Sequence, residues 1–183
     1  SVNPAMTTDQ IIALGKIDGL SQVEGFQSAK IEWRRAPGDE WLVANLNARE
    51  DLKVQQVTRW DLVAGTYPSG NDVAIEKGFG EIHNLAIGDM IETRVNERVR
   101  QVRIVGIINN REANATFSPD LILYMAHQRF GEITGNENYG TVAGRVDAFN
   151  PDGSFNQAQA DAIDTNVEEW LNKQEIDSQG LMP

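Results

Sequence analysis

The stretch GFGEIHNLAIGDMIETRV, residues 78–95, holds two glycines one residue apart, then a Gly88-Asp89 pair and an alternating run that ends at Val95. Gly88 can adopt a positive φ that is costly for a residue with a side chain, and this lets a short helix turn into the next strand. Asp89 can accept hydrogen bonds from backbone amides that such a turn leaves unpaired. We therefore predict a helix-to-strand corner here and not a catalytic loop.

A phosphate-binding loop is the first alternative for the two glycines at 78–80. Such a loop needs backbone amides at a helix start and a nearby Lys, Ser or Thr. Glu76 and Glu81 flank these glycines and would repel phosphate, and only Lys77 offsets them. The third glycine of a dinucleotide fingerprint is also missing. We expect no nucleotide and no other cofactor.

A metal site is the second alternative. His83 and His127 are the two histidines of the chain, and neither has a partner at the spacing of a paired metal ligand. Glu81 and His83 would diverge on a helix. The segment 149–157 lacks the spaced acidic ligands and closing Glu of a calcium loop, and the absence of cysteine excludes thiolate sites. We expect no metal.

The sequence also predicts no catalytic residue. It has no G-x-S-x-G motif, and carboxylate pairs such as Glu168-Glu169 are consecutive, so they do not converge on a helix. A free-standing module that binds a small ligand stays open as an alternative, as does an enzyme built from the carboxylates. In the binding module the tryptophans would line a pocket: Trp33, Trp41, Trp60 and Trp170.

The charge of the chain argues against nucleic-acid partners. Its formal net charge is −11 and its pI is about 4.6, which gives a field that repels phosphate backbones. The arginines between Arg94 and Arg111 alternate with other residues, as on the wet face of a strand. No apolar run approaches the roughly 20 residues that cross a bilayer, and the N-terminus does not resemble a signal peptide. We expect a cytosolic protein or a soluble piece of a larger one.

Hydrophobic periodicity predicts both helices and strands. We expect a first helix that starts at a Thr7/Gln10 capping box and a last helix over 155–173 that is capped by Ser154. Between them we expect a short helix over 75–84, a strand-to-helix segment over 121–133 and a polar loop over 111–120. Strands are predicted over 21–35, 40–48, 89–95, 98–110 and 140–148, with the third and fourth paired through a turn at Asn96-Glu97.

Residues 61–110 resemble the MacB-like periplasmic core domain of FtsX-like ABC transporter permeases. In that family a strand ends in a glycine, a polar turn and a short helix follow, and a Gly-Asp corner leads into an alternating strand and a strand ending Val-Val-Gly-Ile. The structural motif residues that match here are Gly65, Gly88, Asp89 and Gly106. Thr66 stands where the family often has arginine, and Asn84-Leu85 replaces Gly-Leu.

The resemblance implies an α+β fold, in which a βαβ-type, porter-like platform (1–56 and 112–183) carries an inserted β-rich subdomain (57–111). It implies a non-catalytic domain on the extracytoplasmic face of the bacterial membrane, which couples conformational change to substrate or partner handling. A separate cytoplasmic ATPase would hydrolyse ATP. The expected partners are the parent transmembrane helices, that ATPase, and a second permease copy or an extracytoplasmic protein. The chain ends, near Val2 and Leu181, are expected to lie close together.

Overall fold

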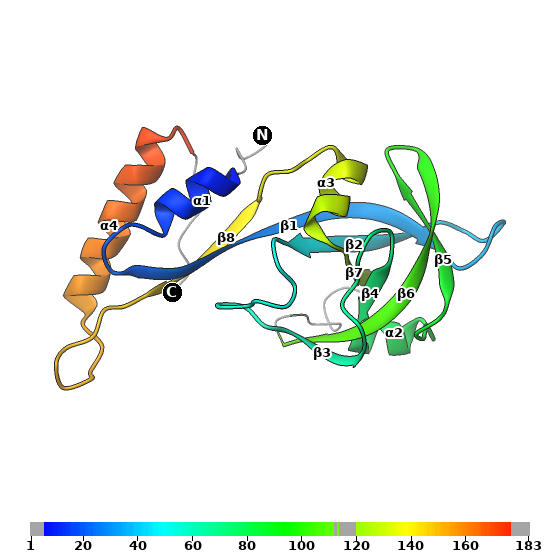
Figure 1. The fold of residues 1–183 in the computed structure, drawn as a ribbon, viewed down its shortest axis with the longest axis horizontal. Coiled ribbons are helices and arrows are strands. Elements are labelled where there is room, and N and C mark those ends of the chain that lie inside the picture. The colour runs from blue at the N-terminus through cyan, green and yellow to red at the C-terminus, as the bar shows by residue number, and fades with distance from the viewer. Residues whose placement is uncertain (1–5, 112, 114–119, 177–183) are drawn as a thin grey trace. The chain divides into compact units, whose positions relative to one another are not determined.

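The computed structural model describes residues 6–111, 113 and 120–176, and Figure 1 shows its helices and strands. In chain order these described elements are α1 (Thr8–Leu14), β1 (Leu20–Arg34), β2 (Leu42–Arg49), β3 (Trp60–Gly65), β4 (Val73–Glu76), α2 (Lys77–Ile82), β5 (Met90–Val95), β6 (Arg98–Asn110), β7 (Leu121–Tyr124), α3 (His127–Thr134), β8 (Thr141–Val146) and α4 (Gln157–Lys173). The α+β class is thereby confirmed. The polar loop expected over 111–120 falls largely outside the described residues, as do Val2 and Leu181.

The chain divides into two compact units. Gln27–Glu137 form one, which we call the barrel unit. Ser1–Phe26 and Asn138–Pro183 form the other, which we call the terminal unit because it is built from both ends of the chain. The strand β1 begins in the terminal unit and ends in the barrel unit.

Six strands of the barrel unit form a closed ring. The sheet runs β2-β7-β4-β6-β5-β1, and β2 also pairs with β1, which joins the two ends of the order. The pairs β2–β7 and β4–β6 are parallel, whereas β1–β5, β5–β6 and β4–β7 are antiparallel. Closure leaves no ring strand with an open edge, and β3 lies off the ring, paired with β6.

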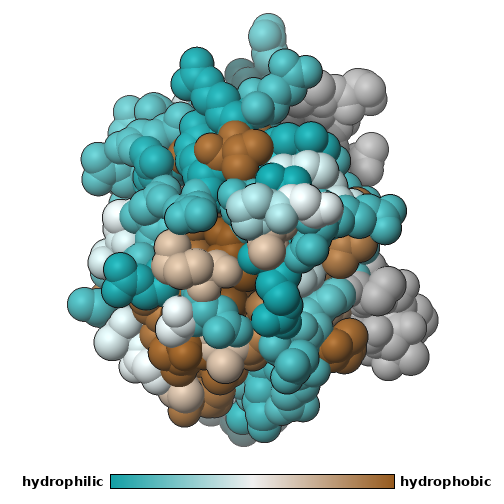
Figure 2. Space-filling view, turned by 90° about the vertical axis from the view of Figure 1, so that its right-hand side faces the viewer, coloured by the Kyte–Doolittle hydropathy of each residue, from teal (hydrophilic) through white to brown (hydrophobic). Residues whose placement is uncertain are grey.

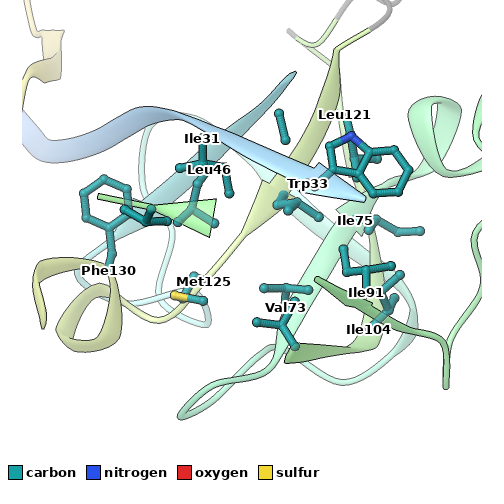
Figure 3. Close-up of a cluster of buried hydrophobic side chains, with 14 of the residues drawn as sticks. Ile31, Trp33, Leu46, Val73, Ile75, Ile91, Ile104, Leu121, Met125 and Phe130 are labelled. Atoms are coloured by element: carbon teal, nitrogen blue, oxygen red, sulfur yellow. The ribbon is translucent and has the colours of Figure 1, made fainter. Parts of the chain in front are cut away.

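Side chains from all six strands fill the ring (Figure 3). Alternate residues of each strand point to the same side, so Ile31 and Trp33 of β1 enter the core while Glu32 and Arg34 do not. Phe79 of α2 and Phe130 of α3 pack against the same cluster. Because side chains occupy the interior, this barrel is a packed core and not a channel.

The barrel explains why the observed units differ in extent from the predicted platform and insertion. The predicted boundaries at 56/57 and 111/112 both fall inside Gln27–Glu137. Closing the ring requires β1 and β2 from before the predicted insertion and β7 from after it. These pairings connect residues far apart in the sequence, and the local pattern of 57–111 does not contain them.

The terminal unit packs two helices on a pair of strands. The start of β1 pairs with β8 in antiparallel register, whereas the predicted βαβ-type platform would have parallel strands. Ile11 and Leu14 of α1 and Ile163 and Val167 of α4 share one apolar cluster, and Gly19 leaves room for the Ile163 side chain. Both helices therefore bury one face in the apolar core of the terminal unit.

The cap of the first helix is the one predicted from the sequence, whereas the cap of the last helix is a different residue. Thr7 and Gln10 form the predicted capping box. The last helix is capped by Asn156, whose side chain accepts from the Gln159 amide, and not by Ser154. Ser154 instead hydrogen-bonds Asp152 in the preceding turn, so its hydroxyl is already engaged.

Within the described residues, none of the helices combines the length and the apolar character that crossing a bilayer would require.

Candidate functional site

The structure brings the four predicted motif residues together around β6. Gly65 lies opposite Gly106 in the β3–β6 register. Two residues before Gly106, Ile104 accepts a hydrogen bond from the Gly88 amide (2.8 Å) and donates one to the Asp89 carbonyl (2.9 Å). The motif is therefore one junction, where β3, β6 and the α2–β5 corner meet through backbone atoms.

Gly65 and Gly106 are needed because the two strands approach each other closely. A Cβ on Gly106 would lie 2.2 Å from the Thr66 carbonyl oxygen, and a Cβ on Gly65 would lie 2.2 Å from the Val105 carbonyl oxygen. Gly65 also has φ of +74°. The Thr66 amide donates to Val105 across this contact (2.9 Å). Any side chain at either glycine would push the strands apart.

The helix-to-strand corner expected at Gly88-Asp89 is present. Gly88 has φ of +99°, and the Asp89 carboxylate accepts from the Ala86 amide (2.9 Å). A Cβ on Gly88 would meet no atom within 4 Å. Its requirement for glycine is thus conformational, unlike the steric requirement at Gly106.

Contacts at both ends hold α2 in place beside this corner. The Glu76 carboxylate accepts from the Phe79 amide (3.1 Å) and caps the N-terminus. At the C-terminus the guanidinium of Arg35, from the β1–β2 loop, donates to the carbonyls of His83 (2.8 Å) and Asn84 (2.7 Å). Glu76 therefore serves the helix directly, as a cap.

The two histidines have structural contacts in different parts of the barrel unit. The His83 ring packs edge-on against Trp33, with ring centroids 5.2 Å apart. His127 Nδ1 lies 2.7 Å from Gln27 Oε1. Among the residues that the structure describes, no group of three or more His, Cys, Asp or Glu side chains is placed to hold a metal ion.

A charged cluster around Trp41 was missed by the sequence interpretation. The guanidinium groups of Arg34 and Arg94 each lie 4.4 Å from the centroid of the Trp41 ring. Arg34 pairs with Glu92 at 2.6 Å and Arg94 pairs with Glu32 at 2.5 Å. The alternating charges of β1 and β5 could have indicated these cross-strand pairs, but the approach of Trp41 from a loop has no local signal.

The Arg94 pair perturbs both of its members. The hydrogen bond from Arg94 holds the pKa of the Glu32 carboxyl below its ordinary value, and Glu32 in turn raises the pKa of Arg94. Both groups are charged at neutral pH, and the Glu32–Arg94 and Arg34–Glu92 pairs connect β1 to β5.

Among the cavities that open on the described part of the barrel unit, two are large enough for a small ligand. One, of about 300 Å³, is mostly apolar and lies between β3 and α2; its lining residues are Val63, Ala64, Ile75, Lys77, Gly80, Glu81, Leu85 and Ile107. The other, of about 410 Å³, has polar and apolar surface in similar amounts; it is lined by Arg49, Glu50, Asp51, Leu52, Lys53, Thr66, Tyr67, Pro68, Ser69, Ala126 and His127.

Tryptophan lines neither cavity. Trp33 and Trp60 are buried, Trp41 lies between two arginines, and Trp170 packs on the core of the terminal unit. The pocket that the ligand-binding alternative expected from the tryptophans is not formed by either cavity.

The surface near α2 carries exposed apolar side chains. Figure 2 shows apolar side chains gathering in the lower part of the face that it displays. Val63 beside the apolar cavity and Ile82 of α2 are both more than half exposed. Exposed apolar side chains therefore lie on both β3 and α2 of the barrel unit.

This fold is one that occurs in extracytoplasmic domains of ABC-type transporter permeases. It is similar to the extracellular domain of the noncanonic ABC-type transporter YknZ from Gram-positive bacteria, with 13% identity over 94% of this chain and 86% of that one and a TM-score of 0.63. The periplasmic region of MacB from Actinobacillus actinomycetemcomitans is 15% identical over 94% of this chain and 75% of its own, with a TM-score of 0.60. A domain of a protein classed as a permease from Porphyromonas gingivalis is 13% identical over 94% of this chain and 78% of its own, with a TM-score of 0.54.

At these identities the likeness establishes the fold alone, and it supports the α+β class and the MacB-like resemblance. No family model matches the sequence, and no curated protein matches it either.

Proposed function

We propose that this chain is a non-catalytic extracytoplasmic domain of a bacterial ABC transporter permease. It would lie on the periplasmic or extracellular face of the cell membrane as part of an integral membrane protein. The observation that carries the proposal is the fold, because the extracellular domain of YknZ and the periplasmic region of MacB each match 94% of the chain.

The positions of the first and last described residues support this function. Met6 and Ile176 both belong to the apolar cluster of the terminal unit. A domain inserted between two membrane helices must leave and re-enter the same bilayer surface. A unit built from both ends of the chain meets that requirement.

The proposed role is mechanical. The strand β1 pairs with β8 through its first residues and with β5 through Glu32, Trp33 and Arg34. One continuous strand thus pairs with a strand of each unit. We propose that movement of the membrane helices reaches the barrel unit through β1 and is used there to handle a substrate or a partner.

The partners follow from this role. The domain would be joined to the parent transmembrane helices, and a cytoplasmic ATPase would hydrolyse the ATP that drives the cycle. Direct contacts would be made with a second permease copy or with an extracytoplasmic protein. Nucleic acid is not among the partners, since the net charge of −11 opposes it.

Spin labels at Val2 and Leu181 test the geometry that the proposal needs. We expect a separation well below the long dimension of the domain, because both ends return to one bilayer surface. A compact chain of this length has a radius of gyration of about 16 Å. Labels roughly 40 Å or more apart, on that scale, would place the ends at opposite poles and favour a free-standing module.

A further inference from the structure

The loop between β8 and α4 carries two exposed aromatic side chains. We call residues 147–156 the phenylalanine loop. Phe149 is 52% exposed and Phe155 is 55% exposed, and their rings meet edge to face with centroids 6.0 Å apart. Aromatic side chains are enriched at protein interfaces and depleted on free surfaces, so an adjacent exposed pair needs an explanation.

Hydrogen bonds hold this loop in one conformation. The Asn150 amide donates to the Ser154 carbonyl (2.8 Å), and the Asn156 amide donates to the Ala148 carbonyl (2.9 Å). The Asp152 carboxylate accepts from the Ser154 amide (2.9 Å) and the Ser154 hydroxyl (2.6 Å). A bridge also pairs Phe149 with Phe155. The two rings are therefore presented without the ordering cost that a flexible loop would add on binding.

The loop and the helix that follows it are acidic in sequence. Between Val146 and Asn172 the sequence has six acidic residues and no basic one. The hydrogen bonds from Ser154 lower the pKa of Asp152, so this carboxylate is ionised beside the two rings at neutral pH. The nearest basic residue in sequence, Arg145, is paired with Asp147 at 3.8 Å.

We propose that the phenylalanine loop docks a second protein, whose complementary surface is an apolar cleft rimmed by lysine and arginine side chains. Two phenyl rings would fill the cleft, and the carboxylates would meet the basic rim. An anionic lipid surface does not fit, because such surfaces attract basic segments. A second copy that used the same loop would bring two acidic surfaces together. This docking function goes beyond the proposed mechanical role.

A photoreactive residue tests the proposal in the full-length protein in its own cells. Phe149 is replaced by p-benzoylphenylalanine, and the control carries the same residue at Ile12, which is 54% exposed on the same unit. We expect an adduct with a protein at position 149 and none at Ile12. Mass spectrometry should map it to a segment that contains both apolar and basic residues.

Charge exchange then separates docking from chance proximity. Asp147→Lys reverses a charge whose side chain is 54% exposed and keeps the Asp152–Ser154 hydrogen bonds. It should lower the yield of the adduct by about tenfold, and a Lys→Asp or Arg→Asp change at the mapped segment should restore it. Phe155→Ser should also abolish the adduct while the unfolding midpoint changes little, because the side chain is exposed. An adduct with lipid, with a second copy of this chain or with an acidic segment would overturn the proposal. Absence of any adduct above the Ile12 control would do so as well.

Discussion

Two glycines near β6 are required for different physical reasons. Gly106 is fixed by space, since its missing side chain lets the Thr66 carbonyl approach. Gly88 is fixed by conformation, since its φ of +99° is rarely adopted by other residues although the surrounding space is open. The distinction gives each position its own response to substitution.

Gly88→Val should destabilise the fold by about 1–3 kcal/mol through backbone strain. The measurement is the free energy of unfolding from a denaturant titration. Gly140→Val is the matched control, because a Cβ at Gly140 also meets no atom within 4 Å and its φ lies outside the positive range. Equal midpoints for Gly88→Val and wild type would show that the corner does not depend on glycine.

At the scale of elements, the β5–β6 hairpin contains a strained turn. Asn96 and Glu97 both have positive φ, 49° and 63°. Two-residue turns of this kind match the twist of a hairpin, and they favour Asn at the first position and Gly at the second. Glu97 therefore occupies the position that glycine would fill best.

Glu97→Gly should stabilise the protein. The left-handed conformation costs an L-residue about 1–2 kcal/mol, and the greater freedom of glycine in the unfolded chain offsets part of that, so we expect a net gain of about 0.5–1 kcal/mol. Asn96→Gly should gain less, because asparagine tolerates this region. Chemical denaturation measures both, and a loss of stability in Glu97→Gly would contradict the account of the turn.

The Glu32–Arg94 ion pair between β1 and β5 should make the free energy of unfolding depend on pH. The Arg94 hydrogen bond lowers the folded-state pKa of Glu32. Its contribution is therefore present above the unfolded-state pKa and is lost as the pH falls through the folded-state pKa.

Comparing wild type with Glu32→Gln isolates this contribution. The difference in unfolding midpoint should be largest near neutral pH and should shrink as the pH falls below the ordinary carboxyl value of 4.5. A difference that stays constant from about pH 6 to about pH 3 would show that Glu32 contributes nothing through its charge.

Local elements were predictable from the sequence because their causes are local. The Thr7/Gln10 capping box, the Asn96-Glu97 turn and the Gly88 corner each depend on residues within a few positions of one another. The cap of the last helix was assigned wrongly to Ser154, since two polar residues two positions apart, Ser154 and Asn156, are both good caps. Only their competing hydrogen bonds decide between them.

Closure of the barrel and the approach of Trp41 to Arg34 and Arg94 were not predictable in this way. Both rest on pairings between segments distant in sequence, such as Ala44 with Leu121 in β2–β7. A short apolar strand has the same pattern whichever partner it pairs with. The same holds for the candidate site. Gly65, Gly88 and Gly106 could each be recognised in the sequence, but their proximity around β6 depends on the fold.

At the scale of the whole molecule, we propose that both units lie on the extracytoplasmic side of a membrane. The fold supports this assignment through the YknZ and MacB domains. Mechanical coupling and partner docking both require it, because the barrel unit and the phenylalanine loop must be reachable from outside the cytoplasm.

A single cysteine measures that location directly. The chain has no cysteine of its own, and Val54 of the barrel unit is well exposed, so Val54→Cys in an otherwise cysteine-free parent protein gives one reactive thiol. A membrane-impermeant maleimide is applied to intact cells, or to spheroplasts where an outer membrane is present, with a cysteine in a cytoplasmic protein as control. We expect labelling of Val54→Cys before lysis and of the control only afterwards. Labelling of Val54→Cys only after lysis would contradict it.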